Sequence, residues 1–199
     1  RLGVKWRRVA GTSAGAITAC LLAAGCTAAE ITRVETEEME FRRFMDKGLI
    51  DRIPLLGKLA SVVFEKGIYE GDYFEDWLVG KLAAKGVRSF GDLREATEER
   101  GLKVVASDVT RREMIVLPDD LGDYGRQADL FPVARAVRMS MSLPYFFEPV
   151  EMDYPTSGGG LRKAYIVDGG ILSNFPVWLF DVREGKDRKS TRLNSSHYS

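Results

Sequence analysis

The sequence has few of the residues that build covalent or metal-bound scaffolds: among 199 residues there are two cysteines and one histidine, His197. A chain this poor in thiols does not carry the disulfide framework of a small secreted domain. It also lacks a run of ~18 apolar residues, which is the length that a membrane-spanning helix needs. Lys+Arg and Asp+Glu number 29 each, so no overall field favours nucleic acid or an anionic membrane.

What remains is the composition of an ordinary globular domain, with 45% hydrophobic residues. The chain opens at Arg1 and enters a strand pattern almost at once, so we expect the natural N-terminus to be missing. From Arg183 onward the apolar pattern stops, and residues 183–199 are typical of a disordered or foreign tail. The predicted folded domain is therefore residues 6–182.

Helical and strand patterns alternate along this domain. Helices are predicted over residues 14–24, 28–39, 73–84, 90–100 and 132–141, and strands over 4–11, 103–107, 113–117 and 165–167. Thr27 and Glu30 form a capping-box pattern, Asp72 is a predicted N-cap, and Gly25 and Gly86 end their helices. This alternation predicts an α/β sandwich with a mainly parallel sheet.

The sharpest chemical signal is Gly11-Thr12-Ser13-Ala14-Gly15, a G-x-S-x-G between a strand and a helix. A sharp strand-to-helix turn exposes the serine oxygen at the positive end of the helix. Side chains two positions either side of the serine would collide, which explains both Gly11 and Gly15. The alternative is an ordinary turn that caps a helix, but the context favours a nucleophile. The Ala14 amide is then a candidate oxyanion donor.

A nucleophilic serine needs a base, and the sequence offers two candidates. The order Ser13, Asp168, His197 matches a hydrolase triad. A catalytic histidine must be held by packed structure, however, and the polar tail offers none. Asp168 directly follows an apolar strand and precedes Gly169 and Gly170, whose lack of side chains allows close approach. Taken alone, this pattern is also that of a plain Asp-Gly turn.

Taken together, these motifs resemble the patatin-like lipid acyl hydrolases. Residues 11–15 resemble the family's nucleophile elbow, and Asp168-Gly169-Gly170 resembles its catalytic Asp-Gly-Gly. Residues 140–147 resemble its segment of small residues, proline and aromatics, and Asn174 and Pro176 stand where the family tends to have them. The resemblance covers about residues 6–180. It implies a three-layer α/β/α sandwich and a Ser13–Asp168 dyad that hydrolyses fatty-acyl esters of phospholipids or related lipids, with no cofactor and no metal.

The chain departs from that family pattern at its start. The family carries a glycine-rich oxyanion loop with an arginine upstream of the elbow, and we expect that loop and the family's first sheet strand to be missing from this chain. Residues 158–162 have the similar sequence Gly-Gly-Gly-Leu-Arg. They follow the elbow and precede the strand at Tyr165, however, which predicts a surface hairpin turn.

Three further features are expected to serve the structure of the domain. An apolar stretch within residues 49–64 is expected to be a buried cap, although it could line an acyl pocket or contact a membrane. Residues 145–147, Tyr-Phe-Phe, are expected in the core. Asp108, Asp119 and Asp120 lack the ligand spacing of a cation site and are expected in turns.

The function predicted from the sequence is therefore a serine lipid acyl hydrolase with a lipid or acyl-ester substrate and transient membrane-surface contact. The alternatives are an esterase with a triad through His197, and a catalytically inactive lipid-binding or regulatory module. Nothing indicates a nucleic-acid partner. The oligomeric state is open, and a cytoplasmic or membrane-peripheral location is favoured.

Overall fold

A computed structural model describes residues 8–34, 36, 72, 74–95, 101–144 and 147–172. Several expectations fall outside these ranges: the apolar stretch within 49–64, Tyr145 and Phe146, Asn174 and Pro176, and the tail with His197. The start of the first strand and the end of the helix predicted over 28–39 also lie outside. Within the described part of the chain, no helix has the length and hydropathy to cross a membrane.

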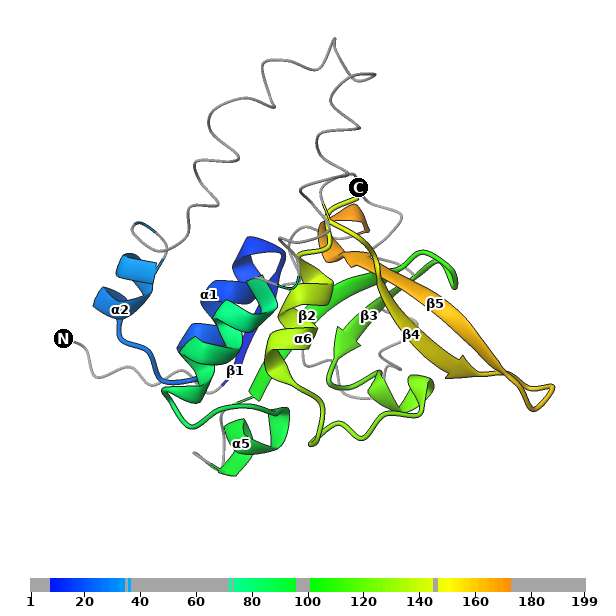
Figure 1. The fold of residues 1–199 in the computed structure, drawn as a ribbon, viewed down its shortest axis with the longest axis horizontal. Coiled ribbons are helices and arrows are strands. Elements are labelled where there is room, and N and C mark those ends of the chain that lie inside the picture. Colours follow the sequence, from blue (N-terminus) through cyan, green and yellow to red (C-terminus); the bar gives the residue numbers. More distant parts are fainter. Residues whose placement is uncertain are drawn as a thin grey trace, which may run out of the picture.

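The centre of the fold is a five-stranded sheet (Figure 1). Its strands are β1 (Arg8–Thr12), β2 (Gly101–Asp108), β3 (Glu113–Leu117), β4 (Val150–Pro155) and β5 (Leu161–Asp168). Only β1 and β2 pair in parallel, whereas β2–β3, β2–β5 and β4–β5 are antiparallel. The expected mainly parallel sheet is thus wrong for these strands. The connections 109–112 and 156–160 are too short for a crossover, so each closes a hairpin.

The register of β2 brings the ends of β1 and β5 together. β1 pairs with residues 101–105 of β2, and β5 pairs with residues 106–108. β3 pairs with residues 104–108 and so overlaps both partners. Because a strand residue has one partner on each edge, β3 occupies one edge, and β1 and β5 share the other. They meet there head to head, with Thr12 opposite Val105 and Asp168 opposite Ala106.

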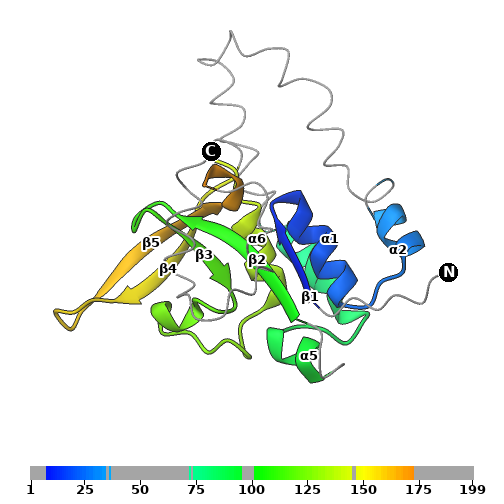
Figure 2. The same cartoon turned by 180° about the vertical axis from the view of Figure 1, so that it is seen from behind.

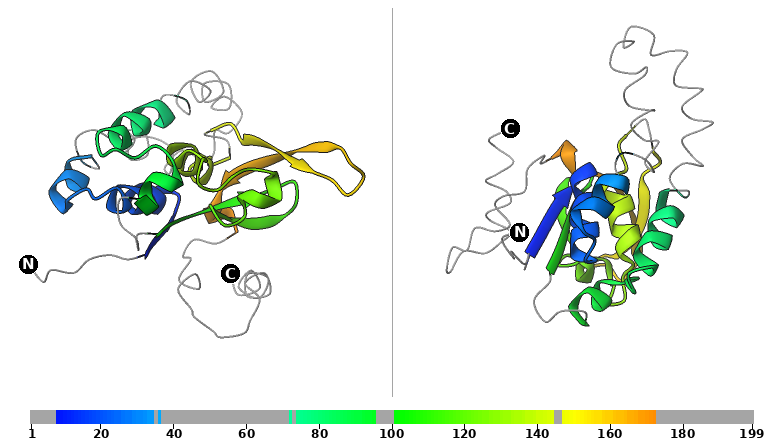
Figure 3. Two further views of the ribbon diagram at one scale, coloured as in Figure 1. Left: turned by 90° about the horizontal axis from the view of Figure 1, so that it is seen from below. Right: turned by 90° about the vertical axis from the view of Figure 1, so that its left-hand side faces the viewer.

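Helices cover one face of this sheet. Their bounds are α1 (Ala14–Ala23), α2 (Ala28–Arg33), α5 (Phe90–Glu95) and α6 (Val133–Ser140), with a further helix over residues 74–83. Helices α1 and α6 pack on the sheet, and the helix over 74–83 lies outside them (Figure 3). From behind, β1, β2 and β3 stand in front of these helices (Figure 2).

The local signals for these helices are largely confirmed. Thr27 and Glu30 form the predicted capping box, and Gly25 and Gly86 adopt left-handed conformations with φ of 81° and 74°. Asp72 is a correction, because it is itself helical and does not precede the helix. Cys20 and Cys26 are both free, as expected for a chain without a disulfide scaffold.

The core lies between the sheet and these helices. Its largest fully buried side chains include Ile17 and Leu21 of α1, Leu78 and Leu82 of the helix over 74–83, and Met139 of α6. On the opposite face of the sheet, Val105, Met114 and Val116 are also buried. Burial on both faces is typical of a sheet inside a layered α/β fold. The described helices supply one of the two outer layers that a three-layer sandwich requires.

Candidate active site

Ser13 forms a sharp turn between β1 and α1. Its φ of 54° and ψ of −131° place a non-glycine residue in the left-handed half of conformational space, which costs on the order of 1–3 kcal/mol. A Cβ on Gly11 would lie 2.1 Å from the carbonyl oxygen of Gly15, so only glycine fits there. A Cβ on Gly15 would meet nothing within 4 Å. The expectation that both glycines avoid a collision therefore holds for Gly11 and is wrong for Gly15.

Asp168 ends β5 beside this turn. A Cβ on the next residue, Gly169, would lie 2.4 Å from the Val105 carbonyl oxygen and 2.8 Å from Cγ2 of Thr12. Asp168-Gly169 is thus packed directly against the end of β1, one residue before Ser13. Gly169, Gly170 and Ile171 continue as a short 3-10 helix, η4 (Gly169–Ile171). The structure brings Ser13, Asp168, Gly11 and Gly169 together, although they span most of the chain.

The carboxyl group of Asp168 is buried, and only one of its two oxygens has a hydrogen bond of good geometry among the described residues. Asp168 is 1% exposed. Its Oδ1 accepts a hydrogen bond from the Gly170 amide at 2.6 Å. Oδ2 is buried and makes no hydrogen bond of good geometry within the described residues. Burial raises the pKa of Asp168, whereas the nearby Ser13 hydroxyl and the Gly170 amide act to lower that pKa. A carboxyl with a raised pKa is a stronger base, which suits it to accept a proton from a serine.

The segment after α6 fixes the backbone of both residues. The Ser13 amide donates to Oγ of Ser140 at 2.9 Å, and this hydroxyl donates to the Val105 carbonyl at 2.6 Å. The Asp168 amide donates to the Ser142 carbonyl at 2.9 Å. Sequence reasoning noted residues 140–147 as part of a resemblance and gave Ser140 no role. No local signal identifies such a contact, because Ser140 is 127 residues from Ser13.

A buried arginine supports this segment. Arg138 is 6% exposed, and it donates to Oγ of Ser142 at 2.5 Å and to the Glu148 carbonyl at 3.2 Å. Its guanidinium lies 5.2 Å from the centroid of the Phe147 ring. Burial lowers the pKa of Arg138. The Ser142 hydroxyl in turn donates to the Arg138 carbonyl at 2.9 Å, so its side chain is fixed by Arg138 alone among the described residues.

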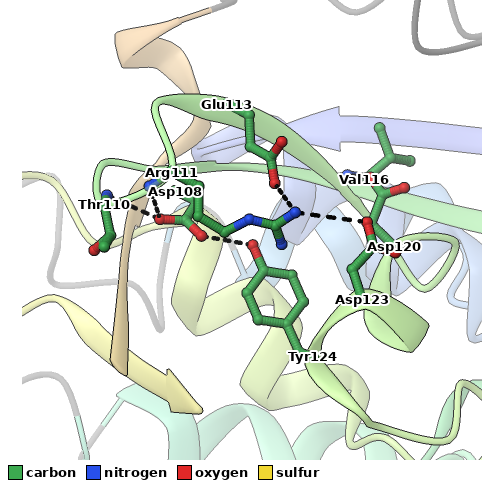
Figure 4. Close-up of polar contacts among 8 residues, drawn as sticks. All are labelled: Asp108, Thr110, Arg111, Glu113, Val116, Asp120, Asp123 and Tyr124. Carbon is green, nitrogen blue, oxygen red and sulfur yellow. Dashed lines mark hydrogen bonds and ion pairs between the residues drawn. The ribbon is translucent and has the colours of Figure 1, made fainter. Parts of the chain in front are cut away.

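A second polar cluster lies at the C-terminal end of β2 (Figure 4). Oδ1 of Asp108 accepts hydrogen bonds from the Thr110 and Arg111 amides at 2.9 Å each. Oδ2 of Asp108 accepts from the Tyr124 hydroxyl at 2.7 Å. The Arg111 guanidinium pairs with Glu113 at 2.9 Å and packs on the Tyr124 ring. Asp108 is therefore the last residue of β2, where a turn was expected, and both of its carboxylate oxygens are hydrogen-bonded.

The other predicted aspartates and the glycine-rich stretch also serve local structure. Asp119 forms an ion pair with Lys103, and Asp120 accepts a hydrogen bond from the Val116 amide. No group of three metal-ligating side chains occurs among the residues that the structure describes. Residues 156–160 form the turn between β4 and β5, with Gly159 at φ 83°, which confirms the expected hairpin. This hairpin tip lies well away from η4 (Figure 1).

The sequence is similar to a known family and to a bacterial relative. The sequence model of the family described as patatin-like phospholipase matches residues 1–181. A Bacillus subtilis (strain 168) protein, described as uncharacterized protein YqhO, is 47% identical over 188 residues. The match covers 94% of this chain and 60% of the relative, so the chain spans less than two thirds of that relative's length.

Proposed function

Because the chain belongs to the patatin-like phospholipase family, we propose that it is a serine lipid acyl hydrolase in which Ser13 is the nucleophile and Asp168 the base. The substrates are fatty-acyl esters of phospholipids or related lipids. The reaction needs no cofactor, since the serine supplies the nucleophile and the carboxylate moves the proton.

The first half of the reaction acylates Ser13. Oγ of Ser13 attacks the ester carbonyl while Asp168 takes its proton, and the tetrahedral intermediate carries the negative charge on the former carbonyl oxygen. The Ala14 amide is the first of α1, has no partner within the helix, and supplies a donor at its positive end. Asp168 then returns the proton to the departing alcohol. In the second half, Asp168 takes a proton from the water that attacks the acyl-serine, and it returns this proton to Oγ of Ser13 as the fatty acid leaves.

The observation that supports this proposal best is Oδ2 of Asp168, which is buried near the Ser13 hydroxyl and has no hydrogen bond of good geometry among the described residues. A buried polar atom without a partner costs stability, and such an arrangement is typical of sites where a group must accept a proton. The strained backbone of Ser13 supports the same conclusion, because strain of this kind concentrates at active sites. Neither feature is needed for a turn that only caps α1.

The direct test is release of fatty acid from mixed vesicles of phosphatidylcholine and phosphatidylglycerol, with a short-chain p-nitrophenyl ester as a soluble substrate. We expect hydrolysis by the wild-type chain and none by Ser13→Ala. Saturable vesicle binding by both proteins without fatty-acid release would favour a lipid-binding or regulatory module instead.

The triad alternative is tested with the same assay. His197→Ala, or removal of residues 183–199, should leave hydrolysis unchanged if Asp168 is the base. Loss of hydrolysis in both variants would favour the esterase triad, in which Asp168 orients His197 and His197 is the base. Transient contact with a lipid surface is part of the proposal, because the substrate resides there.

A further inference from the structure

The hydroxyl group of Ser140 links the nucleophile to the neighbouring strand. It accepts a hydrogen bond from the Ser13 amide and donates one to the carbonyl of Val105. Val105 is the β2 residue opposite Thr12. The Ser140 hydroxyl therefore links the Ser13 amide, which directly follows β1, to the Val105 carbonyl of β2. Ser140 is fully buried, so no solvent can take over either hydrogen bond.

This bridge acts where the chain is most constrained. Ser13 has its strained φ at this point, and a strained conformation persists only when surrounding contacts over-determine it. The Val105 carbonyl that Ser140 binds is also the atom on which Gly169 packs. Ser140 thus fixes the Ser13 backbone relative to the residue that follows Asp168.

We propose that Ser140 is a positioning residue for the acyl transfer, which holds the backbone of Ser13 so that its Oγ faces Oδ2 of Asp168. This inference rests on the proposed function, since it assumes that Ser13 is the nucleophile. Ser140 acts through the Ser13 main chain and takes no proton from the substrate.

The test is the rate at which a fluorophosphonate probe labels Ser13 in the Ser140→Ala variant. The probe bonds its phosphorus to Oγ of Ser13, fluoride leaves, and the serine proton passes to Asp168. A small displacement of a reacting group costs up to ~10²-fold in rate. We therefore expect the maximal labelling rate, per folded molecule, to fall about 10- to 100-fold, while the probe concentration at half-maximal rate changes little.

Two further variants separate positioning from folding. Tyr124→Phe is the matched control, because it also removes one buried hydroxyl that bonds at 2.7 Å, and its partner Asp108 belongs to the other polar cluster. It should lower stability without lowering the labelling rate of the folded fraction. Ser140→Cys keeps the size of the buried group with a thiol that bonds weakly, so it should fold and still label more slowly than wild type.

The outcomes are distinct. Slow labelling in Ser140→Ala and Ser140→Cys, with wild-type labelling in Tyr124→Phe, supports the positioning role. Wild-type rates in Ser140→Cys and in the folded fraction of Ser140→Ala overturn it and leave the proposed function standing. If Ser140→Ala does not fold, the rate for Ser140→Cys alone decides. No labelling of Ser13 in the wild-type chain overturns the proposed function, and the role of Ser140 with it.

Discussion

Two buried aspartates of one antiparallel ladder have opposite surroundings. Asp108, at the end of β2, has both carboxylate oxygens occupied, one by two backbone amides and the other by the Tyr124 hydroxyl. Asp168, at the end of β5, has one oxygen bonded to the Gly170 amide and one without a good partner. Both residues are at most 1% exposed. Burial alone therefore does not distinguish the proposed base, Asp168, from Asp108. The difference between them is an oxygen that has no good hydrogen-bond partner among the described residues and lies beside a strained serine.

The two regions also differ in how they hold their shape. The region of Asp168 and Ser13 depends on close backbone approach at Gly11 and Gly169. The cluster around Asp108 depends on side-chain hydrogen bonds and ion pairs (Figure 4). Substitutions that add a methyl group should thus damage the first region most, and substitutions that remove a polar group should damage the second.

The largest effect is expected from Gly11→Ala, with Gly15→Ala as its matched control. The new Cβ of Gly11→Ala would lie 2.1 Å from the Gly15 carbonyl, so α1 must move from β1, and overpacking of this kind costs about 3 kcal/mol or more. Gly15→Ala meets no atom within 4 Å and should stabilise the exposed first turn of α1 by up to ~1 kcal/mol. Urea unfolding followed by circular dichroism measures both. Equal losses would contradict the steric explanation of the elbow.

A smaller effect, of opposite sign for the two aspartates, is expected from the asparagine variants. Asp108→Asn turns one acceptor into a donor within a fully bonded network, which should cost about 1–3 kcal/mol of unfolding free energy. Asp168→Asn keeps an acceptor for the Gly170 amide and removes a buried charge, so its unfolding free energy should equal or exceed that of wild type. The same urea titrations measure both. A large loss in Asp168→Asn would mean that its Oδ2 is a structural acceptor.

The smallest effect is the pH dependence that Asp168 imparts to stability. The raised pKa means that the folded chain binds this proton more tightly than the unfolded chain does. Stability is therefore lost as the pH rises from the ordinary aspartate pKa of ~3.9 through the raised value, and the cost is constant above it. The difference in unfolding free energy between Asp168→Asn and wild type should grow across that window. A flat difference would contradict the raised pKa.

The sequence predicts the parts of this molecule that depend on local chemistry. The elbow at Ser13, the capping box at Thr27 and the turn at residues 156–160 follow from residues within one turn of each other. The mixed sheet was missed, because the strand partners of β5 depend on which edge of β2 is free. Ser140 was missed for the same reason, since its role exists only when α6 packs beside the elbow.

The central claim is that Asp168 activates Ser13, and labelling by a fluorophosphonate probe with peptide mass mapping tests it most directly. The probe requires an activated serine and reports the modified residue itself. We predict selective labelling of Ser13 in the wild-type chain, a rate at least about 10²-fold lower in folded Asp168→Asn, and loss of labelling on acidification through the raised pKa of Asp168. Labelling of Asp168→Asn at the wild-type rate would contradict the dyad.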